Sequence, residues 1–113
     1  MIPFRQLFTF TKLEVATAFK HAHLKTYHQG LTLLQAPLEH ASRSEPYGKL
    51  LIIIAAAAGK AHDRNAMKRK LRSVFYQEKL YRTDPSFWIL IVKKKAVGMP
   101  FKDIEKFLQE SLS

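Results

Sequence analysis

The chain contains no cysteine, so disulfide bonds, thiolate metal sites and cysteine nucleophiles are excluded. Internal repeats, linkers and low-complexity segments are absent too. The longest apolar run, residues 50–58, is about half the length that crosses a bilayer. The first residues lack the basic region, apolar stretch and cleavage site of a secretory signal. We therefore expect one cytoplasmic domain, residues 1–113, with a single core.

Acidic side chains are scarce. Nine Asp and Glu face nineteen Lys and Arg, which gives a formal net charge of +10. On a small domain this charge destabilises the folded state through self-repulsion unless a polyanion binds to it. The composition therefore favours a nucleic acid as partner, with an anionic membrane surface as the second choice.

The first half of the chain predicts one helix followed by strands. Thr11 and Glu14 have the spacing of a capping box, which predicts a helix over residues 12–23. Strand-forming residues before Pro37 predict a strand over 31–36, and a short strand is expected at 25–28.

The second half predicts further elements after a polar loop at 39–47. They are a strand over 49–56 that is apolar on both faces, a helix over 63–80, a strand over 87–92 after a break at 84–86, and a closing helix over 101–112. This order predicts an α+β sandwich in which helices pack on one mixed sheet.

The helix predicted over 63–80 has two different faces. At about 100° per residue, one side gathers the apolar residues Met67, Leu71, Val74 and Phe75. The other side gathers Asn65, Lys68, Arg69, Arg72 and Tyr76. A merely solvated face mixes charges of both signs, whereas neighbouring cations here repel one another. Phosphates would offset that repulsion, so we predict that this face binds nucleic acid.

Individual roles follow from side-chain chemistry. Lys68, Arg69 and Arg72 are expected to contact phosphates, because a guanidinium pairs with phosphate through two hydrogen bonds. Asn65 both donates and accepts, which suits a ribose hydroxyl or a base edge. Lys70 points away from the main arc and is expected to be only solvated.

The start of the same helix offers a second set of groups. Lys60 and the main chain around Gly59 precede the helix amino terminus, where the dipole favours an anion. Arg64 is also close to this end. A nucleoside triphosphate is not expected, because a phosphate-binding loop needs glycine where Ile54 stands and a hydroxyl where Ala61 stands.

The segment from Gly59 to Arg72 resembles the arginine-rich RNA-binding helix of the bacterial ribonuclease P protein subunit, Gly-Lys-Ala-x-x-Arg-Asn-x-x-Lys-Arg-x-x-Arg. The matching residues are Gly59, Lys60, Ala61, Arg64, Asn65, Lys68, Arg69 and Arg72. The resemblance implies an α-β-β-β-α-β-α two-layer sandwich similar to domain 2 of ribosomal protein S5. It also implies a left-handed βαβ crossover, although right-handed crossovers are the general rule.

The resemblance also implies a function. It is that of the ribonuclease P protein subunit, which binds ribonuclease P RNA and the 5′ leader of precursor tRNA and promotes endonucleolytic removal of the leader. The RNA subunit and its Mg²⁺ ions perform the hydrolysis. Neither a membrane nor a nucleoside triphosphate is an expected partner.

This chain departs from the family pattern at two places. The aromatic pattern Phe-x-x-Val-Phe keeps its last position as Phe19 but has Val15 at its first. Phe19 is expected either to stack on a leader base or to belong to the core. Two lysines that usually precede the basic helix are replaced by Ala56 and Ala57, which predicts a smaller salt dependence of RNA binding.

Other side chains bear on alternative functions. The histidines at 21, 23 and 28 have no carboxylate spaced to orient them, so no metal or catalytic site is expected. Residues 93–95, three lysines, extend the phosphate-binding surface or form a solubilising turn. The rival hypotheses are a general RNA- or DNA-binding protein, such as a ribosome-associated factor, and a nuclease that needs no RNA subunit.

Overall fold

The computed structural model describes residues 4–28, 30–36, 48–82 and 87–112. The predicted loop at 39–47 and the break at 84–86 lie outside these residues. The α-helices described are α1 (Lys12–His21), α2 (Ala61–Gln77), α3 (Lys94–Val97) and α4 (Phe101–Leu112). The strands are β1 (His23–His28), β2 (Leu31–Ala36), β3 (Lys49–Ile54) and β4 (Phe87–Val92), and short 3₁₀ helices are η1 (Phe4–Leu7), η3 (Ala56–Ala58) and η4 (Leu80–Arg82).

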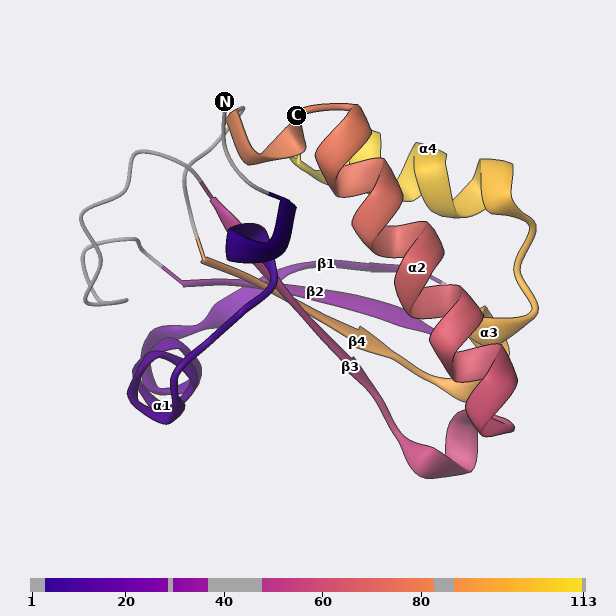
Figure 1. Ribbon diagram of the computed structural model, residues 1–113, viewed down its shortest axis with the longest axis horizontal. Helices are drawn as coiled ribbons and strands as arrows, with labels where there is room; N and C mark the ends of the chain where they lie inside the picture. The colour runs from indigo at the N-terminus through magenta and orange to yellow at the C-terminus, as the bar shows by residue number, and fades with distance from the viewer. Residues whose placement is uncertain (1–3, 29, 37–47, 83–86, 113) are drawn as a thin grey trace.

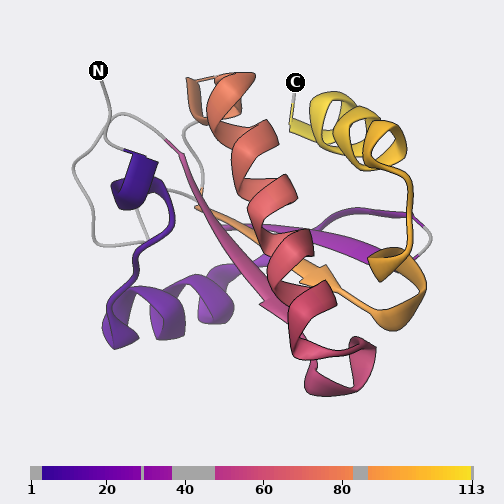
Figure 2. The same cartoon turned by 45° about the vertical axis from the view of Figure 1, so that its right-hand side comes forward.

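The strands form one mixed sheet in the order β1-β2-β4-β3. β2 pairs antiparallel with β1 and β4, whereas β3 and β4 are parallel and are joined through α2. When the sheet is viewed from the α2 side and turned so that β3 and β4 point upwards, β4 lies to the left of β3 (Figures 1 and 2). The crossover is therefore left-handed, as the sequence resemblance implies.

The two faces of the sheet are covered unequally. Helices α2 and α4 pack on one face and α1 on the other (Figure 1). Alternate residues of β4 separate accordingly, because neighbouring side chains on a strand point to opposite faces. Trp88 and Leu90 join the large core under α2 and α4, whereas Phe87 and Ile89 join a smaller cluster with Ala18 of α1. The α1 face is the less completely covered of the two.

The boundary between α1 and β1 differs from the prediction. The helix ends at His21, since Ala22 has the extended dihedrals φ −73° and ψ 145°, and the strand begins at His23. The predicted helix 12–23 was therefore too long and the strand 25–28 too short. β1 is mostly exposed and contains an irregularity between Leu24 and Thr26, so it lacks the alternating apolar pattern that marks a strand.

The boundaries of α2 also differ. β3 ends at Ile54 rather than at 56, and the alanines that follow form η3. α2 then runs from Ala61 to Gln77 instead of 63–80. Its end is marked by Lys79 at φ 53°, a left-handed residue of the kind that follows helix termini.

The turn after β4 was not predicted as a helix but forms α3. Gly30, directly before β2, lies against it, since its carbonyl oxygen accepts a hydrogen bond from the Lys93 amide at 2.9 Å. Gly30 has φ +89°, and a Cβ there would lie 3.0 Å from the amide nitrogen of Ala96. Glycine is required at this position by both the dihedral angle and the close approach.

Candidate nucleic-acid interface

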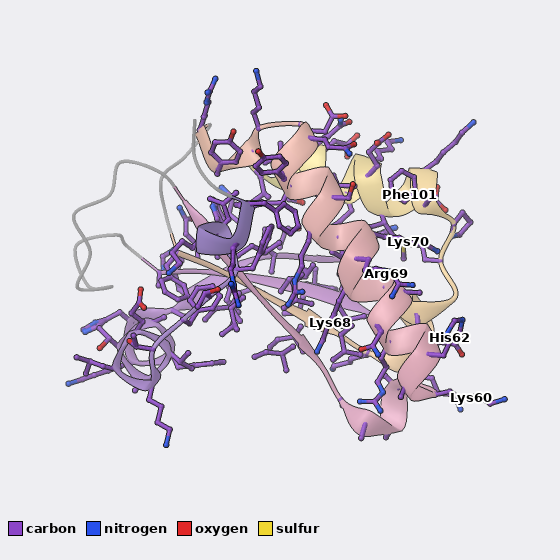
Figure 3. All side chains as sticks on the ribbon, viewed as in Figure 1. Lys60, His62, Lys68, Arg69, Lys70 and Phe101 are labelled. Carbon is purple, nitrogen blue, oxygen red and sulfur yellow. The ribbon has the colours of Figure 1, made fainter. Side chains whose placement is uncertain are left out.

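Helix α2 separates apolar and basic side chains as predicted. Its buried residues are Met67, Leu71, Val74 and Phe75. Of the predicted binding residues, Asn65 and Arg69 are exposed, whereas Lys68 and Arg72 are half-buried. Lys60 and His62 lie at the amino-terminal end of α2, and Lys68, Arg69 and Lys70 follow along its middle (Figure 3). The structure thus brings the predicted basic residues onto one element beside the β3 edge of the sheet.

The positive charge of α2 is not neutralised within the described part of the chain. The helix carries one carboxylate, Asp63, in its first turn. Among the described residues the ion pairs are Lys49–Glu14 and Lys106–Glu110, and neither involves α2. Residues 60–72 contain six Lys and Arg but only one carboxylate, Asp63, so the helix surface keeps a large uncompensated positive charge.

The structure shows where the Arg64 side chain points, which the sequence did not predict. Its Nε donates to the Gly59 carbonyl oxygen at 3.2 Å, and the side chain is half-buried. This bond holds the turn between η3 and α2. Lys60 is the N-cap residue and is exposed, so its ammonium remains available at the helix amino terminus.

Arg72 is packed more closely than a simple phosphate contact would require. Its guanidinium carbon lies 5.6 Å from the centroid of the Phe8 ring, and its Nε is buried with no hydrogen-bond partner in the described structure. Phe4 begins η1 and Phe8 directly follows this short helix, which sequence analysis missed. Their four-residue spacing around Arg5 was the available signal, but its meaning depends on a contact with a helix more than sixty residues away.

The open face of the sheet forms a second candidate surface. Apolar side chains on it are only partly buried: Leu34, Leu51, Ile53 and Ile91. Phe19 is 43% exposed, so the alternative that it belongs to the core is wrong. Tyr27, which sequence analysis missed, is 73% exposed and pairs with Thr32, placing it on the same face as Leu34.

Lys49 joins α1 to the start of β3. Its Nζ donates to the Thr9 carbonyl oxygen and lies 3.3 Å from Glu14 Oε2 and 4.6 Å from the Phe10 ring centroid. Burial raises the pKa of Glu14, but the Thr11 amide and Lys49 outweigh it and hold that pKa below its ordinary value. This buried contact fixes one side of the open sheet face.

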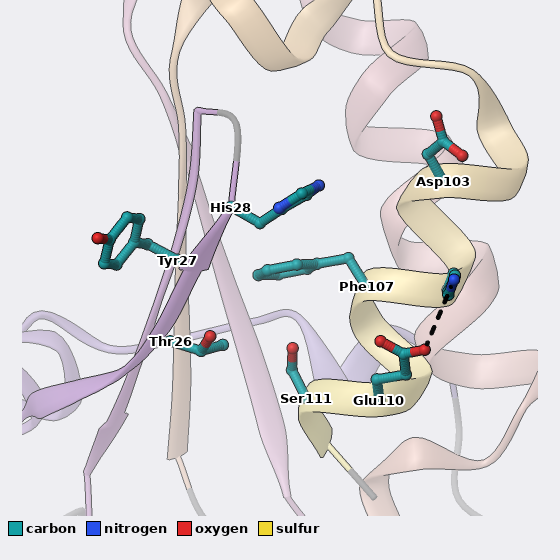
Figure 4. Close-up of a pocket in the computed structure, with 8 residues that line it drawn as sticks. Thr26, Tyr27, His28, Asp103, Phe107, Glu110 and Ser111 are labelled. Atoms are coloured by element: carbon teal, nitrogen blue, oxygen red, sulfur yellow. Dashed lines mark ion pairs between the residues drawn. The ribbon is translucent and has the colours of Figure 1, made fainter.

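A cavity of about 410 Å³ lies between β1 and α4 (Figure 4). His28 stacks on Phe107 with ring centroids 6.4 Å apart, while Lys106 pairs with Glu110 at 4.0 Å. Tyr27 points away from α4 in this view. The cavity carries charges of both signs and lies at β1, the sheet edge opposite β3, so it does not extend the basic surface of α2.

In the described ranges no group of three or more His, Cys, Asp or Glu could hold a metal ion. No helix in those ranges is both long and apolar enough to cross a membrane. Lys93, Lys94 and Lys95 are exposed beside η3, as both a phosphate-binding surface and a solubilising turn require.

Comparison with known proteins identifies the family. The ribonuclease P family model matches residues 11–113. The ribonuclease P protein component of onion yellows phytoplasma is 27% identical over 62 residues, which cover 55% of this chain and 44% of that protein. The match therefore spans less than half the length of this curated relative.

Solved structures show the same fold. The ribonuclease P protein of Staphylococcus aureus superposes with a TM-score of 0.77 at 19% identity, covering 94% of this chain and 92% of that one. The protein from Thermotoga maritima gives 0.73 at 21% identity, covering 92% and 94%. Since the family model spans nearly the whole chain and includes all of α2, this chain belongs to the ribonuclease P family.

Proposed function

We propose that this chain is the protein subunit of ribonuclease P and acts as one RNA-binding domain. It binds ribonuclease P RNA through α2 and the 5′ leader of precursor tRNA through the open sheet face, and so promotes endonucleolytic removal of the leader. The RNA-binding residues are Lys60, Arg64, Asn65, Lys68, Arg69 and Arg72.

The observation that carries this proposal is the uncompensated charge of α2. The helix has a buried apolar side that fixes its rotation, so the basic side is held outward before any partner binds. Lys68 and Arg69 have no ion pair within the described structure that a phosphate would need to displace. Binding therefore gains from counterion release without breaking internal contacts.

Contact with the leader is proposed for the open sheet face. A leader is single-stranded, and single strands bind through bases stacked on aromatic rings. Phe19 and Tyr27 supply exposed rings, and the half-buried aliphatic side chains of β2, β3 and β4 supply an apolar surface. Val15 provides no ring where the family usually has one, and Tyr27 is positioned to supply another on the same face.

The proposed role in catalysis is indirect. The RNA subunit performs the hydrolysis, and Mg²⁺ is held mainly by that RNA. The described residues of this chain do not form a metal site, and no mechanistic step is assigned to them. The chain raises substrate affinity and stabilises the active RNA, and we place it in the cytoplasm with its RNA partner.

The alternative of a general RNA- or DNA-binding protein is not favoured, because the family match extends over residues 11–113 rather than over a basic helix alone. A competition experiment separates the two. Labelled ribonuclease P RNA from the same genome is bound to the chain and challenged with unlabelled ribonuclease P RNA, unrelated structured RNA and duplex DNA. Preference for ribonuclease P RNA supports the proposal, and equal competition by all three contradicts it.

A further inference from the structure

A cavity of about 210 Å³ lies between η1 and α2. It is lined by Phe4, Arg5, Phe8, Thr9 and Arg72. The cavity therefore has room for one planar ring together with a small polar group, and its walls combine two aromatic rings with two guanidinium groups.

The charge in this cavity has no acceptor within the described structure. Arg72 Nε is buried and unpartnered, and its guanidinium is held against the Phe8 ring at 5.6 Å. Neither Arg72 nor the exposed Arg5 is in an ion pair with a described residue. Two guanidinium groups without a carboxylate partner among the described residues favour an anionic ligand, whose oxygens would accept their hydrogen bonds.

Phe4 supplies a ring that is fixed but still open. Its centroid lies 4.8 Å from that of Phe8 and 5.1 Å from that of Tyr76, in a tilted and an edge contact respectively. These contacts order the ring before a ligand arrives, yet the side chain remains 43% exposed. An ordered, exposed ring can stack on a base with little further loss of side-chain entropy.

We propose that this cavity binds one unstacked nucleotide of the RNA held by α2. The base stacks on Phe4, and the adjoining phosphate lies between Arg5 and Arg72. The inference rests on the proposed function, since it requires α2 to bind RNA. It also goes beyond that function, because Lys68 and Arg69 offer charge alone, whereas this cavity recognises the combination of a free base and a phosphate.

The first test separates stacking from charge. For binding to ribonuclease P RNA, Phe4→Leu is expected to raise Kd about tenfold without changing the slope of log K against log salt, because stacking releases no counterions. Arg5→Gln is expected to reduce that slope by about 0.7 to 0.9. Phe101→Leu is the matched control, since Phe101 is 41% exposed at the start of α4, away from the cavity.

The second test locates the nucleotide. Phe4 is replaced by photoreactive p-benzoylphenylalanine, and cross-links are mapped on ribonuclease P RNA with and without precursor tRNA. A cross-link at one unpaired nucleotide supports the inference, and its strand tells whether the RNA subunit or the leader supplies it. Cross-links spread along duplex regions, or none at all, overturn it.

The two proposals fail in different ways. If the unmodified chain shows no preference for ribonuclease P RNA, the proposed function fails. If that preference is present and is weakened by Arg69→Ala, but Phe4→Leu behaves like Phe101→Leu, only the nucleotide site is wrong. Circular dichroism of each variant confirms that the chain is folded, so a loss of binding is not a loss of structure.

Discussion

Lys49 Nζ lies 3.3 Å from Glu14 Oε2, with the two side chains only 9% and 16% exposed. The contact joins the first strand residue of β3 to the first turn of α1, thirty-five positions earlier. Glu14 also completes a capping box with Thr11, so the same carboxylate caps α1 and anchors it to the sheet. Lys49 therefore adds a polar anchor to the apolar packing of Ala18 that holds α1 against the sheet.

Lys49→Met tests this anchor. Methionine keeps the apolar length of the side chain but removes the ammonium that donates to the Thr9 carbonyl oxygen and to Glu14 Oε2. The free energy of unfolding is expected to fall by about 1 to 3 kcal/mol, measured by urea denaturation. Lys102→Met, at an exposed position of α4, is the control and should stay within about 0.5 kcal/mol. Equal effects of both changes would contradict the anchor.

The same pair predicts a pH dependence of stability. Because the pKa of Glu14 is lower in the folded chain than its ordinary value of 4.5, its ionised form stabilises the fold above that value. This contribution is lost as pH falls below 4.5 through the lowered pKa. Glu14→Gln should therefore be less stable than the parent at pH 7, and the difference should shrink towards pH 3. A difference in unfolding free energy that stays constant from pH 7 to pH 3 would refute this prediction.

Salt dependence tests the basic side of α2. Lys68→Ala and Arg69→Ala are each expected to reduce the slope of log K against log salt for RNA binding by about 0.7 to 0.9, since each removes one phosphate contact. Lys70→Ala changes the same charge on the flank of the helix and should leave the slope unaltered. The slope can be measured by filter binding at salt concentrations between about 50 and 200 mM. If Lys70→Ala had as large an effect as Arg69→Ala, the charge would act without a defined face.

The leader surface is tested with two substrates. Phe19→Ala and Tyr27→Ala are each expected to weaken binding of precursor tRNA to the holoenzyme by roughly tenfold, by loss of one stacked base, without weakening binding of mature tRNA. Leu13→Ala is the matched control, because Leu13 is 67% exposed on α1 outside the smaller core cluster. Equal losses for precursor and mature tRNA would place these rings elsewhere than at the leader.

Much of α2 could be predicted from sequence because its signals are local. The apolar side of Met67, Leu71, Val74 and Phe75 follows helical periodicity within one segment, and all four residues are buried as predicted. The family motif lies on the same segment, and its residues from Ala61 to Arg72 all belong to α2. Nothing further is needed to place Lys68 and Arg69 on one surface.

The features that sequence missed depend on contacts distant in the chain. Arg72 contacts Phe8, which follows η1, and Lys49 contacts Glu14 of α1. The burial of Arg72 and Lys49 therefore cannot be predicted from the residues next to them in sequence. β1 was only partly predicted because an exposed edge strand with an irregularity has no apolar alternation. Tyr27 was missed for the same reason, since its face is defined only by pairing with Thr32.

Cleavage of precursor tRNA by the reconstituted ribonucleoprotein tests the central claim most directly. Ribonuclease P RNA from the same genome is assayed at low Mg²⁺ alone, with this chain, and with a variant in which Arg64, Lys68, Arg69 and Arg72 are all alanine. We predict that the chain raises the rate of leader removal, that the variant does not, and that the chain alone cleaves nothing. No gain from the chain, or an undiminished gain from the variant, would contradict the claim.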